Sequence, residues 1–352
     1  MTYGYVVEPD KPDPLVQIVE QMMHEISLAA TPLKWPVDII PALKHLPESL
    51  PGMSWKRIAR EWHKLASTVI EVPYSFVQEQ MKKGDYKPSF VSSIIEQREA
   101  SSTGDDEKSM GNDEDIRYTA ATMYAAGADT TVLSLKSLIL AMLLFPDVQK
   151  KAQKEIDTVI STDTLPSVED RERLPYVNAL AKEAFRWLPV VPMGLSHVAD
   201  EDIDFKEFHI PKGSFLLPAI WWFLHNPEIH ADPHSFDPER YLEPRNEPDP
   251  MGETFGYGRR ICPGRFLADE VVFITIARLL ATHDLRKAVD GRGAEIEPKI
   301  DVTTGLISHL LDFPYSIKPR NKHYADLVRS VEAEIPREPG DAGRLSFDGG
   351  WV

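Results

Sequence analysis

Hydrophobic positions recur at helical spacing in two stretches of the first hundred residues, 15–30 and 55–81, which are separated by the proline-bounded segment 31–52. The segment 99–115 is polar and acidic and has no apolar face, so it predicts a surface loop. The stretch 116–144 contains no proline and is rich in Ala, Met, Leu and Tyr. This pattern predicts a long, largely buried helix, which we call the central helix.

Two shorter helical patterns follow the central helix. The first opens at Pro146 and continues to about residue 160, because proline suits the first turn of a helix. The second covers residues 176–187 and stops near Pro189. Between residues 197 and 217, short alternating segments with turn residues predict a small system of strands.

The last third of the chain mixes irregular and helical segments. Residues 227–250 are rich in proline and charge and predict irregular chain. A glycine-rich loop, 252–264, leads into an apolar helical pattern over 265–282. Residues 321–352 are mostly polar and predict a loosely held tail. The predicted fold class is therefore mainly α with small β-sheets.

Composition narrows the possible environments and partners. Of 352 residues, 42% are hydrophobic and 27% are charged, which is typical of a globular protein. The net charge of −16 opposes binding to nucleic acid and to anionic lipid. The longest apolar run, 138–145, is shorter than the ~18 residues of a membrane-spanning helix. The first thirty residues do not show the basic start and apolar stretch that are typical of a signal peptide. The chain as written is predicted to be soluble and without a membrane anchor.

The single cysteine, Cys262, lies in a loop with three nearby glycines, Gly256, Gly258 and Gly264. Two preceding arginines and the start of a helix favour its thiolate, which could be a nucleophile or a metal ligand. A nucleophile needs a histidine base, which only a segment distant in sequence could supply. No second cysteine or histidine has the spacing of a zinc site. A metal with its own equatorial ligands, as in haem, meets every one of these constraints.

The segment from Phe255 to Gly264 reads Phe-Gly-x-Gly-x-Arg-x-Cys-x-Gly and resembles the cysteine-ligand loop of the cytochrome P-450 superfamily. The resemblance implies that Cys262 is the axial ligand of the haem iron. It also implies that Arg260 binds a haem propionate, that Phe255 packs beside the sulfur, and that Gly256, Gly258 and Gly264 shape the haem cradle. The alternative is an ordinary glycine turn with a buried cysteine.

Two further segments resemble the family in the expected order. Glu183 and Arg186, in Lys-Glu-Ala-Phe-Arg, share one helical face, and Asp-Pro-Glu-Arg-Tyr follows with Arg240 and Tyr241. The latter is similar to the family's Pro-Glu-Arg-Phe segment, with Tyr241 in place of Phe. The resemblance implies a buried structural triad of Glu183, Arg186 and Arg240, whereas the Glu183–Arg186 pair alone would be an ordinary surface ion pair.

The central helix contains Ala-Gly-Ala-Asp-Thr-Thr at 126–131. Glycine and β-branched residues are poor choices in a helix, so a local departure from regular geometry with a groove for water is expected. The segment resembles the family's oxygen-activation signature, which implies that Thr130 binds water there and that Asp129 relays protons. The alternative is a small-residue packing notch with a solvated Asp129.

Family resemblance also suggests where other ligands bind. It implies that His197 binds the second haem propionate, and the alternative is a histidine whose hydrogen bonds are satisfied within a strand. The stretches 190–195 and 303–307, with Tyr124 and Ala125, correspond to substrate-contact positions, and their apolar character predicts a hydrophobic substrate.

The resemblance covers residues 1–320 and predicts a partial P-450 catalytic domain, followed by the polar tail 321–352. The opening region is similar to fungal members of the O-methylsterigmatocystin oxidoreductase type, which oxidise hydrophobic secondary metabolites. The amino-terminal third of the family fold is expected to be missing, so the predicted fold is an amino-terminally truncated P-450 fold.

The implied activity is insertion of one oxygen atom from O2 into a hydrophobic small molecule. The implied cofactor is heme b, iron protoporphyrin IX, and the implied electron donor is an NADPH-cytochrome reductase. A full-length parent is expected on the endoplasmic reticulum membrane. Two alternatives remain open: a truncated, non-catalytic remnant, and a haem-thiolate peroxygenase or isomerase that needs no reductase.

Overall fold

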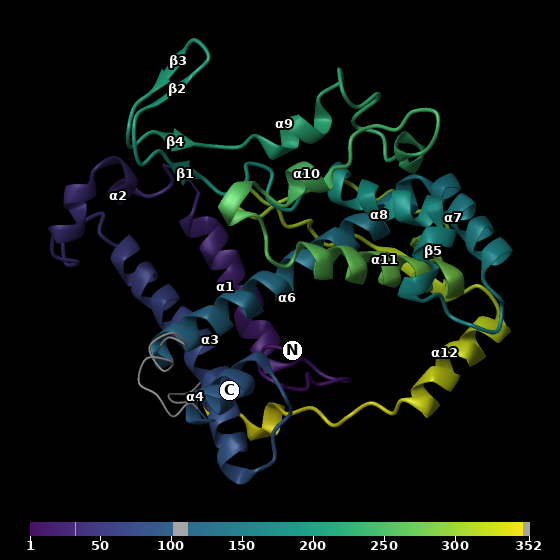
Figure 1. The fold of residues 1–352 in the computed structure, drawn as a ribbon, viewed down its shortest axis with the longest axis horizontal. Helices are drawn as coiled ribbons and strands as arrows, with labels where there is room; N and C mark the ends of the chain where they lie inside the picture. Colours follow the sequence, from purple (N-terminus) through teal and green to yellow (C-terminus); the bar gives the residue numbers. More distant parts are fainter. Residues whose placement is uncertain (32, 101–111, 348–352) are drawn as a thin grey trace. The chain divides into compact units, whose positions relative to one another are not determined.

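The computed structural model describes residues 1–31, 33–100 and 112–347 (Figure 1). The chain divides into two compact units. Unit 1 comprises Met1–Asp129 with Pro336–Val352, and unit 2 comprises Thr130–Ile335. The architecture is mainly helical with small antiparallel sheets, as the sequence predicts.

The two helices that the sequence predicts in the first hundred residues, 15–30 and 55–81, are found, and local sequence signals mark their ends. Helix α1 (Pro14–Ala29) starts at Asp13, whose side chain accepts hydrogen bonds from the amides of Leu15 and Val16 at 2.8 and 3.2 Å. Helix α3 (Trp55–Lys83) ends at Gly84, whose φ of +70° suits a residue without a Cβ. Between them lie α2 (Pro36–Ile39) and η1 (Pro41–His45), and α4 (Phe90–Ala100) follows α3.

The central helix, α6 (Asp113–Leu144), begins three residues before the predicted start. Its first turn carries Asp113, Glu114 and Asp115, whose negative charges suit the positive end of the helix dipole. The predicted loop 99–115 is therefore too long at both ends, because α4 reaches Ala100 and α6 begins at Asp113. Residues 101–111 of that loop lie outside the described residues.

By length and composition, α6 is the one helix within the described residues that is apolar enough to cross a membrane. This is weak evidence, because the core helix of a soluble protein passes the same test, and 44% of its most apolar window is buried. A count of consecutive apolar residues does not find this helix, since Asp129 and Lys136 interrupt the apolar sequence.

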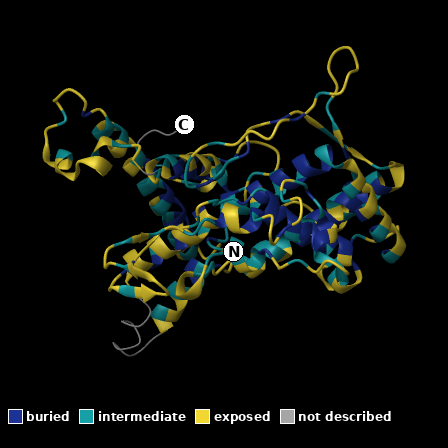
Figure 2. Cartoon of the chain, turned by 90° about the horizontal axis from the view of Figure 1, so that it is seen from above, coloured by how far each residue is buried: buried dark blue, intermediate teal, exposed yellow. Residues whose placement is uncertain are grey.

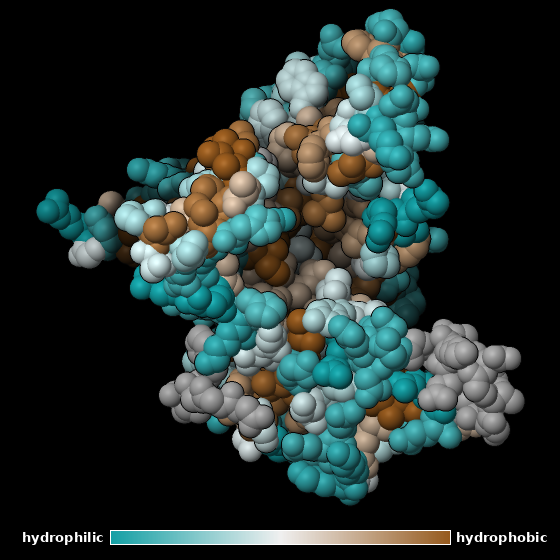
Figure 3. Space-filling model, turned by 90° about the vertical axis from the view of Figure 1, so that its left-hand side faces the viewer, coloured by the Kyte–Doolittle hydropathy of each residue, from teal (hydrophilic) through white to brown (hydrophobic). Residues whose placement is uncertain are grey.

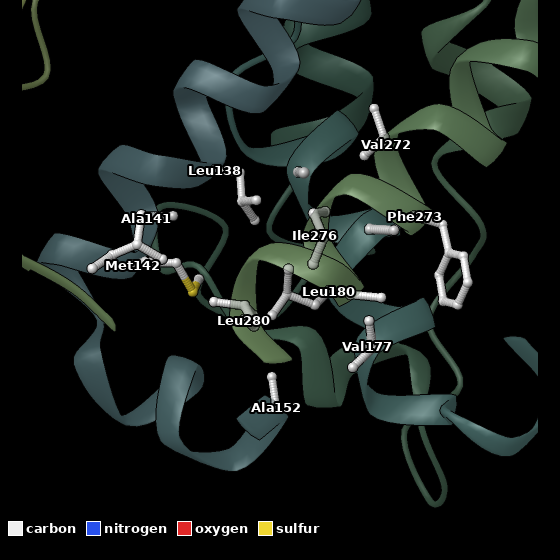
Figure 4. Packing of buried hydrophobic residues seen from close by; sticks show 14 of the residues in the cluster. Leu138, Ala141, Met142, Ala152, Val177, Leu180, Val272, Phe273, Ile276 and Leu280 are labelled. Atoms are coloured by element: carbon white, nitrogen blue, oxygen red, sulfur yellow. The ribbon is translucent and has the colours of Figure 1, made fainter. Parts of the chain in front are cut away.

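The helical core of unit 2 brings together segments that are far apart in sequence. Residues of α6, α7 (Pro146–Val159), α8 (Pro175–Trp187) and α11 (Arg265–Thr282) form one buried cluster (Figure 4). Buried residues of the whole chain are dark blue in Figure 2. Leu138 and Met142 of α6 lie in the same cluster as Leu180 of α8 and Ile276 and Leu280 of α11. The predicted helices 146–160, 176–187 and 265–282 are thereby confirmed to within one residue at each end.

Three two-stranded antiparallel sheets are found in the described part of the chain. β1 (His197–Val198) pairs with β4 (Phe215–Leu216), and β2 (Ile203–Phe205) pairs with β3 (Phe208–Ile210), within the strand system that the sequence predicts. β5 (His283–Lys287) pairs with β6 (Tyr315–Pro319), with Leu285 opposite Ile317. The sequence does not predict this third sheet, because its strands are 27 residues apart and carry few alternating apolar positions.

Short helical elements lie between β4 and α11, in the chain that leads to the cysteine loop and forms it. They are α9 (Ile220–His225), η3 (Pro238–Tyr241), α10 (Met251–Thr254) and η4 (Gly258–Arg260). A further one, η2 (Val168–Arg173), joins α7 to α8. The six prolines of residues 227–250 lie in the largely irregular chain between α9 and α10, as predicted.

Residues 321–347 differ from the predicted loose tail, and residues 348–352 of that tail lie outside the described residues. Helix α12 (Lys322–Glu334) begins at Asn321, whose side chain accepts a hydrogen bond from the Tyr324 amide at 3.1 Å. Further on, Asp341 is buried and its carboxylate accepts a hydrogen bond from the Val6 amide at 2.9 Å, with η5 (Ala342–Arg344) following. The segment is polar, but it is held by caps and long-range hydrogen bonds that polarity alone does not reveal.

Candidate active site

The cysteine loop joins α10 to α11 and is folded back on itself. The Cys262 amide donates a hydrogen bond to the Phe255 carbonyl at 2.8 Å. Gly256 and Gly258 have φ values of +76° and +58°, which L-residues with a Cβ adopt only with strain. Cys262 itself is half-buried and forms no disulfide.

The loop leaves space for a flat ligand. A Cβ built on Gly256 or Gly258 would meet no atom within 4 Å, so both glycines border open space. A Cβ on Gly264 would lie 3.9 Å from the Cys262 Sγ. The described residues contain no group of three or more His, Cys, Asp or Glu side chains that could hold a metal ion. A metal at Cys262 would therefore take its remaining ligands from a cofactor, and the residues present fit a haem.

Two arginines of the loop precede the cysteine. Arg259 and Arg260 are exposed, and neither guanidinium has a hydrogen-bond or ion-pair partner among the described residues. Arg265 differs, because its guanidinium donates to the Cys262 carbonyl at 3.1 Å and stacks on the Phe266 ring at 4.2 Å. Arg259 and Arg260 are thus available for an anionic group such as a propionate.

Phe255 anchors the loop to helix α8. Its ring contacts the ring of Phe185 in α8 edge-on, with centroids 5.3 Å apart, and it packs against the main buried cluster. Phe185 is the neighbour of Arg186, so the same turn of α8 supports both the cysteine loop and the charged network described next.

Glu183, Arg186 and Arg240 come together and are fully buried, each with 0% exposure. Arg186 donates two hydrogen bonds to the Glu183 carboxylate, at 2.7 and 2.8 Å, and Arg240 donates one at 3.1 Å. The two guanidinium groups also donate to backbone carbonyls of 224–235, including that of Ser235, which accepts from both. The buried charges are therefore paired, and they fix the irregular chain that leads to the cysteine loop.

Three further residues complete this network: Tyr241, which the sequence motif contains in place of Phe, and Glu247 and His230, to which no motif points. The Tyr241 hydroxyl donates to Glu183 at 3.1 Å, while Glu247 accepts from Arg240 at 2.8 Å and contacts His230 at 3.0 Å. Burial and the Glu183 charge raise the pKa of Tyr241. Burial opposes ionisation of Glu247, but hydrogen bonds from Arg240, Arg245 and His230 outweigh it and lower the pKa of Glu247 to about 2.

Asp129 and Thr130 lie next to each other on α6. Asp129 is buried, with 8% exposure, and Thr130 is half-buried. The expected departure from helical geometry is not found, because α6 is one uninterrupted α-helix from Asp113 to Leu144. A Cβ on Gly127 would meet nothing within 4 Å, so the helix has open space beside this residue. Packing along the remaining turns compensates for the low helix propensity of glycine.

The other predicted contact residues occupy varied environments. His197 is exposed in β1, with its Nδ1 3.1 Å from the Leu195 carbonyl oxygen. Ile307 is buried, and the amide of Ser308, the residue after the stretch 303–307, donates to the carbonyl of Val190 at 2.8 Å. Tyr124 packs edge-on against Tyr3, 5.7 Å away.

Large apolar side chains are exposed around the β1–β4 sheet of unit 2. Phe215 is 73% exposed and Leu195 62%, and Met193, Val198 and Leu217 are also exposed. Figure 3 shows apolar side chains, in brown, exposed among polar ones on one face. Exposed apolar surface of this kind is typical of binding surfaces for hydrophobic molecules.

Comparison with known proteins agrees with the motif analysis. A family model described as Cytochrome P-450 matches residues 10–307. Cytochrome P-450 monooxygenase CLM2 of Gibberella zeae is 55% identical over 348 residues, which cover 99% of this chain and 66% of that protein. Multifunctional cytochrome P-450 monooxygenase af510 of Aspergillus fumigatus is 45% identical, over 98% of this chain and 65% of that protein.

O-methylsterigmatocystin oxidoreductase of Aspergillus flavus is 34% identical over 98% of this chain and 64% of that protein. The chain thus spans 64 to 66% of the length of these three relatives.

Proposed function

Since the chain belongs to the cytochrome P-450 family, we propose that it is a haem-thiolate monooxygenase that inserts one atom of O2 into a hydrophobic small molecule. The observation that carries this proposal is the cysteine loop. It contains the chain's single thiol and two glycines that have a positive φ and border open space. It also contains two arginines whose guanidinium groups have no partners among the described residues. The proposed cofactor is heme b, iron protoporphyrin IX.

Each loop residue has a role toward this cofactor. Cys262 would bind the haem iron through its thiolate, and Gly256, Gly258 and Gly264 would let the backbone come close to the cofactor. Arg260, and His197 on β1, would bind the propionates. Phe255 holds the loop against α8 through Phe185. When bound, the haem supplies the iron that binds and splits O2, and a thiolate ligand favours that cleavage.

Proton delivery is assigned to α6. Thr130 holds a water molecule with its hydroxyl group, and the Asp129 carboxylate passes protons to that water. The two groups are adjacent in the sequence of one uninterrupted helix.

The proposed partners follow from the proposed reaction and from the apolar side chains that are exposed at the surface. The proposed electron donor is a flavin-containing NADPH-cytochrome reductase, as is general for the family. The exposed apolar side chains around β1 and β4 favour a hydrophobic substrate, and the names of the relatives place them among fungal monooxygenases. For a full-length protein of this type, the endoplasmic reticulum membrane is the proposed location.

The test is the absorption spectrum of the purified chain after addition of hemin, reduction with dithionite and exposure to carbon monoxide. The expected result is the red-shifted Soret band of thiolate-ligated haem. Cys262→Ala should abolish this band, and Cys262→His should bind haem with an unshifted band, which separates loss of the thiolate from loss of the site.

Retention of the red-shifted band in Cys262→Ala would overturn the assignment of the ligand. Folded wild-type chain, verified by circular dichroism, that shows no such band would instead identify the chain as a non-catalytic remnant.

A further inference from the structure

The amino end of α11, which carries the cysteine loop, has little support from hydrophobic packing. None of residues 265–271 is buried, and Phe266 and Leu267 are 66% and 48% exposed. The buried residues of this helix begin at Val272. Gly264 precedes the helix and provides no side-chain cap. The first two turns of α11 must therefore be fixed by something other than apolar contacts or a cap.

An ion pair meets this need. Asp269, in the second turn of α11, accepts two hydrogen bonds from the guanidinium of Arg171, both at 2.7 Å. The remaining edge of the same guanidinium donates to the Asn178 side-chain oxygen at 2.8 Å, and its plane lies 5.0 Å from the Phe273 ring centre. Arg171 and Asp269 are 24% and 19% exposed, so solvent screens the pair only in part.

This pair joins three elements. Arg171 belongs to η2, Asn178 to α8 and Asp269 to α11. η2 is itself fixed at its start, where Asp170 accepts hydrogen bonds from the Ser167 amide and hydroxyl, both at 2.9 Å. The Arg171 guanidinium is thus held by a rigid neighbour, which lets it determine where Asp269 lies.

The position of Asp269 is passed to the cysteine through short contacts. The Ala268 amide, one residue before Asp269, donates to the Gly264 carbonyl at 2.9 Å. The Arg265 guanidinium and amide both donate to the Cys262 carbonyl, at 3.1 and 3.4 Å. Any tilt of the first two turns of α11 would therefore move the backbone of Cys262.

We propose that the Arg171–Asp269 pair positions the haem ligand by fixing the first two turns of α11 and, through them, the Cys262 loop. The proposal rests on the proposed function only in that Cys262 binds haem. Neither residue touches the thiol, so both are positioning residues.

The opposite end of α11 provides a matched control. Arg320 donates to both oxygens of Asp157, at 2.8 and 2.5 Å, and to the carbonyl of Ala281 near the end of the helix at 3.0 Å. This pair has the same bidentate chemistry and similar exposure, 18% and 38%, but it lies where α11 is already packed into the core.

The first experiment measures access to Cys262 in the haem-free chain of 352 residues. The double variant Arg171→Met with Asp269→Leu removes the pair without leaving a charge unpartnered. Because Cys262 is the only cysteine, alkylation by iodoacetamide reports on this loop alone. We expect the alkylation rate to rise at least about fivefold, whereas Arg320→Met with Asp157→Leu should change it by less than about twofold. Equal rates in the two double variants would overturn the proposal.

The second experiment measures the fraction of the reduced, carbon monoxide-bound haem that shows the red-shifted Soret band. This fraction should fall in the Arg171→Met, Asp269→Leu variant and stay at the wild-type level in the control. Arg171→Lys, which keeps the charge but loses the planar fork, should give an intermediate value. An unchanged band in all variants would contradict the proposal.

The two proposals fail in different ways. If the wild-type chain shows no red-shifted band, the proposed function fails, but the alkylation rates still test whether the Arg171–Asp269 pair positions the cysteine loop. If the band is present and alkylation does not distinguish the two pairs, only the positioning role is wrong.

Discussion

At the scale of single residues, the hydroxyl group of Tyr241 forms a buried hydrogen bond that the sequence motif does not predict. The sequence suggests that Tyr241 is a conservative replacement of phenylalanine, yet the Tyr241 hydroxyl donates to the buried Glu183 carboxylate at 3.1 Å. Glu183 also accepts hydrogen bonds from Arg186, Arg240 and the Asp237 amide. A carboxylate with 0% exposure needs all these donors, because water cannot replace any of them.

Tyr241→Phe should lower the free energy of unfolding by about 2 kcal/mol, since it removes a hydrogen bond to a buried charged group. Tyr257→Phe is the matched control, because the Tyr257 hydroxyl donates to Glu253 at the exposed surface, where solvent replaces it. Its effect should be within about 0.5 kcal/mol. Urea denaturation measures both, and equal losses would show that burial of the acceptor is not the cause.

His225 makes stability depend on pH. Its ring has 4% exposure and stacks on Trp221 at 4.4 Å. Burial lowers the pKa of His225 from 6.5 to about 4, and the nearby charges of Arg186 and His234 act in the same direction, against hydrogen bonds to backbone carbonyls. The folded state therefore keeps His225 neutral at pH values where the unfolded chain already binds a proton.

The free energy of unfolding should consequently decrease as pH falls from 6.5 to about 4, by up to about 3 kcal/mol for this residue. Burial also lowers the pKa of His230, which adds to the same trend. His225→Gln should flatten the dependence, whereas His209→Gln, at an exposed position paired with Asp204, should not. Urea midpoints at pH 7, 6 and 5 provide the measurement; parallel curves for His225→Gln and wild type would rule out this origin.

At the scale of elements, backbone conformation separates two glycines that the sequence singles out alike. Both Gly127 and Gly256 border open space, so a methyl group would fit beside either. Gly127 is in the regular helix α6, whereas Gly256 has a φ of +76°. The cost of a side chain therefore depends on φ and not on crowding.

Gly256→Ala should destabilise the haem-free chain by about 1–2 kcal/mol, because an L-residue is strained at positive φ. Gly127→Ala should stabilise it by up to about 1 kcal/mol through better helix propensity. Thermal denaturation of both variants tests the pair, and a loss of stability in Gly127→Ala would show that α6 needs glycine for a reason that its regular geometry does not reveal.

The limits of the helices were the most predictable feature of this protein. The limits of α3, α7, α8 and α11 follow from apolar periodicity and from proline at the first helical positions. α3 continues through Pro73, which is buried, because its apolar face is packed on both sides of that residue. The sheet of β5 and β6 was not predictable, since each strand is stabilised by its partner and not by its own pattern.

At the scale of the whole molecule, the end of the chain helps to hold its beginning. Asp341 exchanges hydrogen bonds with the backbone of Val6, and Arg344 contacts Gln80 and Asp85, so that residues more than 250 positions apart meet within unit 1. Leu345 packs against the apolar cluster of the same unit.

Truncation after Ile335 should therefore loosen unit 1. Amide hydrogen exchange should accelerate at Val6 and its neighbours, because their hydrogen-bond partners are removed, while amides of α8 and α11 in unit 2 keep their protection. Arg344→Met should give a smaller effect in the same region, and Arg329→Met, in an exposed pair within α12, should give none. Protection of Val6 that is unchanged by the truncation would contradict a supporting role of this segment.

The sequence by itself determined the helical class, most helix limits, the cysteine loop and the family of this chain. These features depend on short spacings, which local backbone preferences and a few fixed side chains specify. Only the tertiary structure decided the partners of buried charges: Glu247 and Tyr241 around the triad, Arg171 opposite Asp269, and Asp341 opposite Val6. These partners come together only when segments that are distant in sequence fold onto one another. The sequence pattern around a polar side chain does not indicate which residue will be its partner.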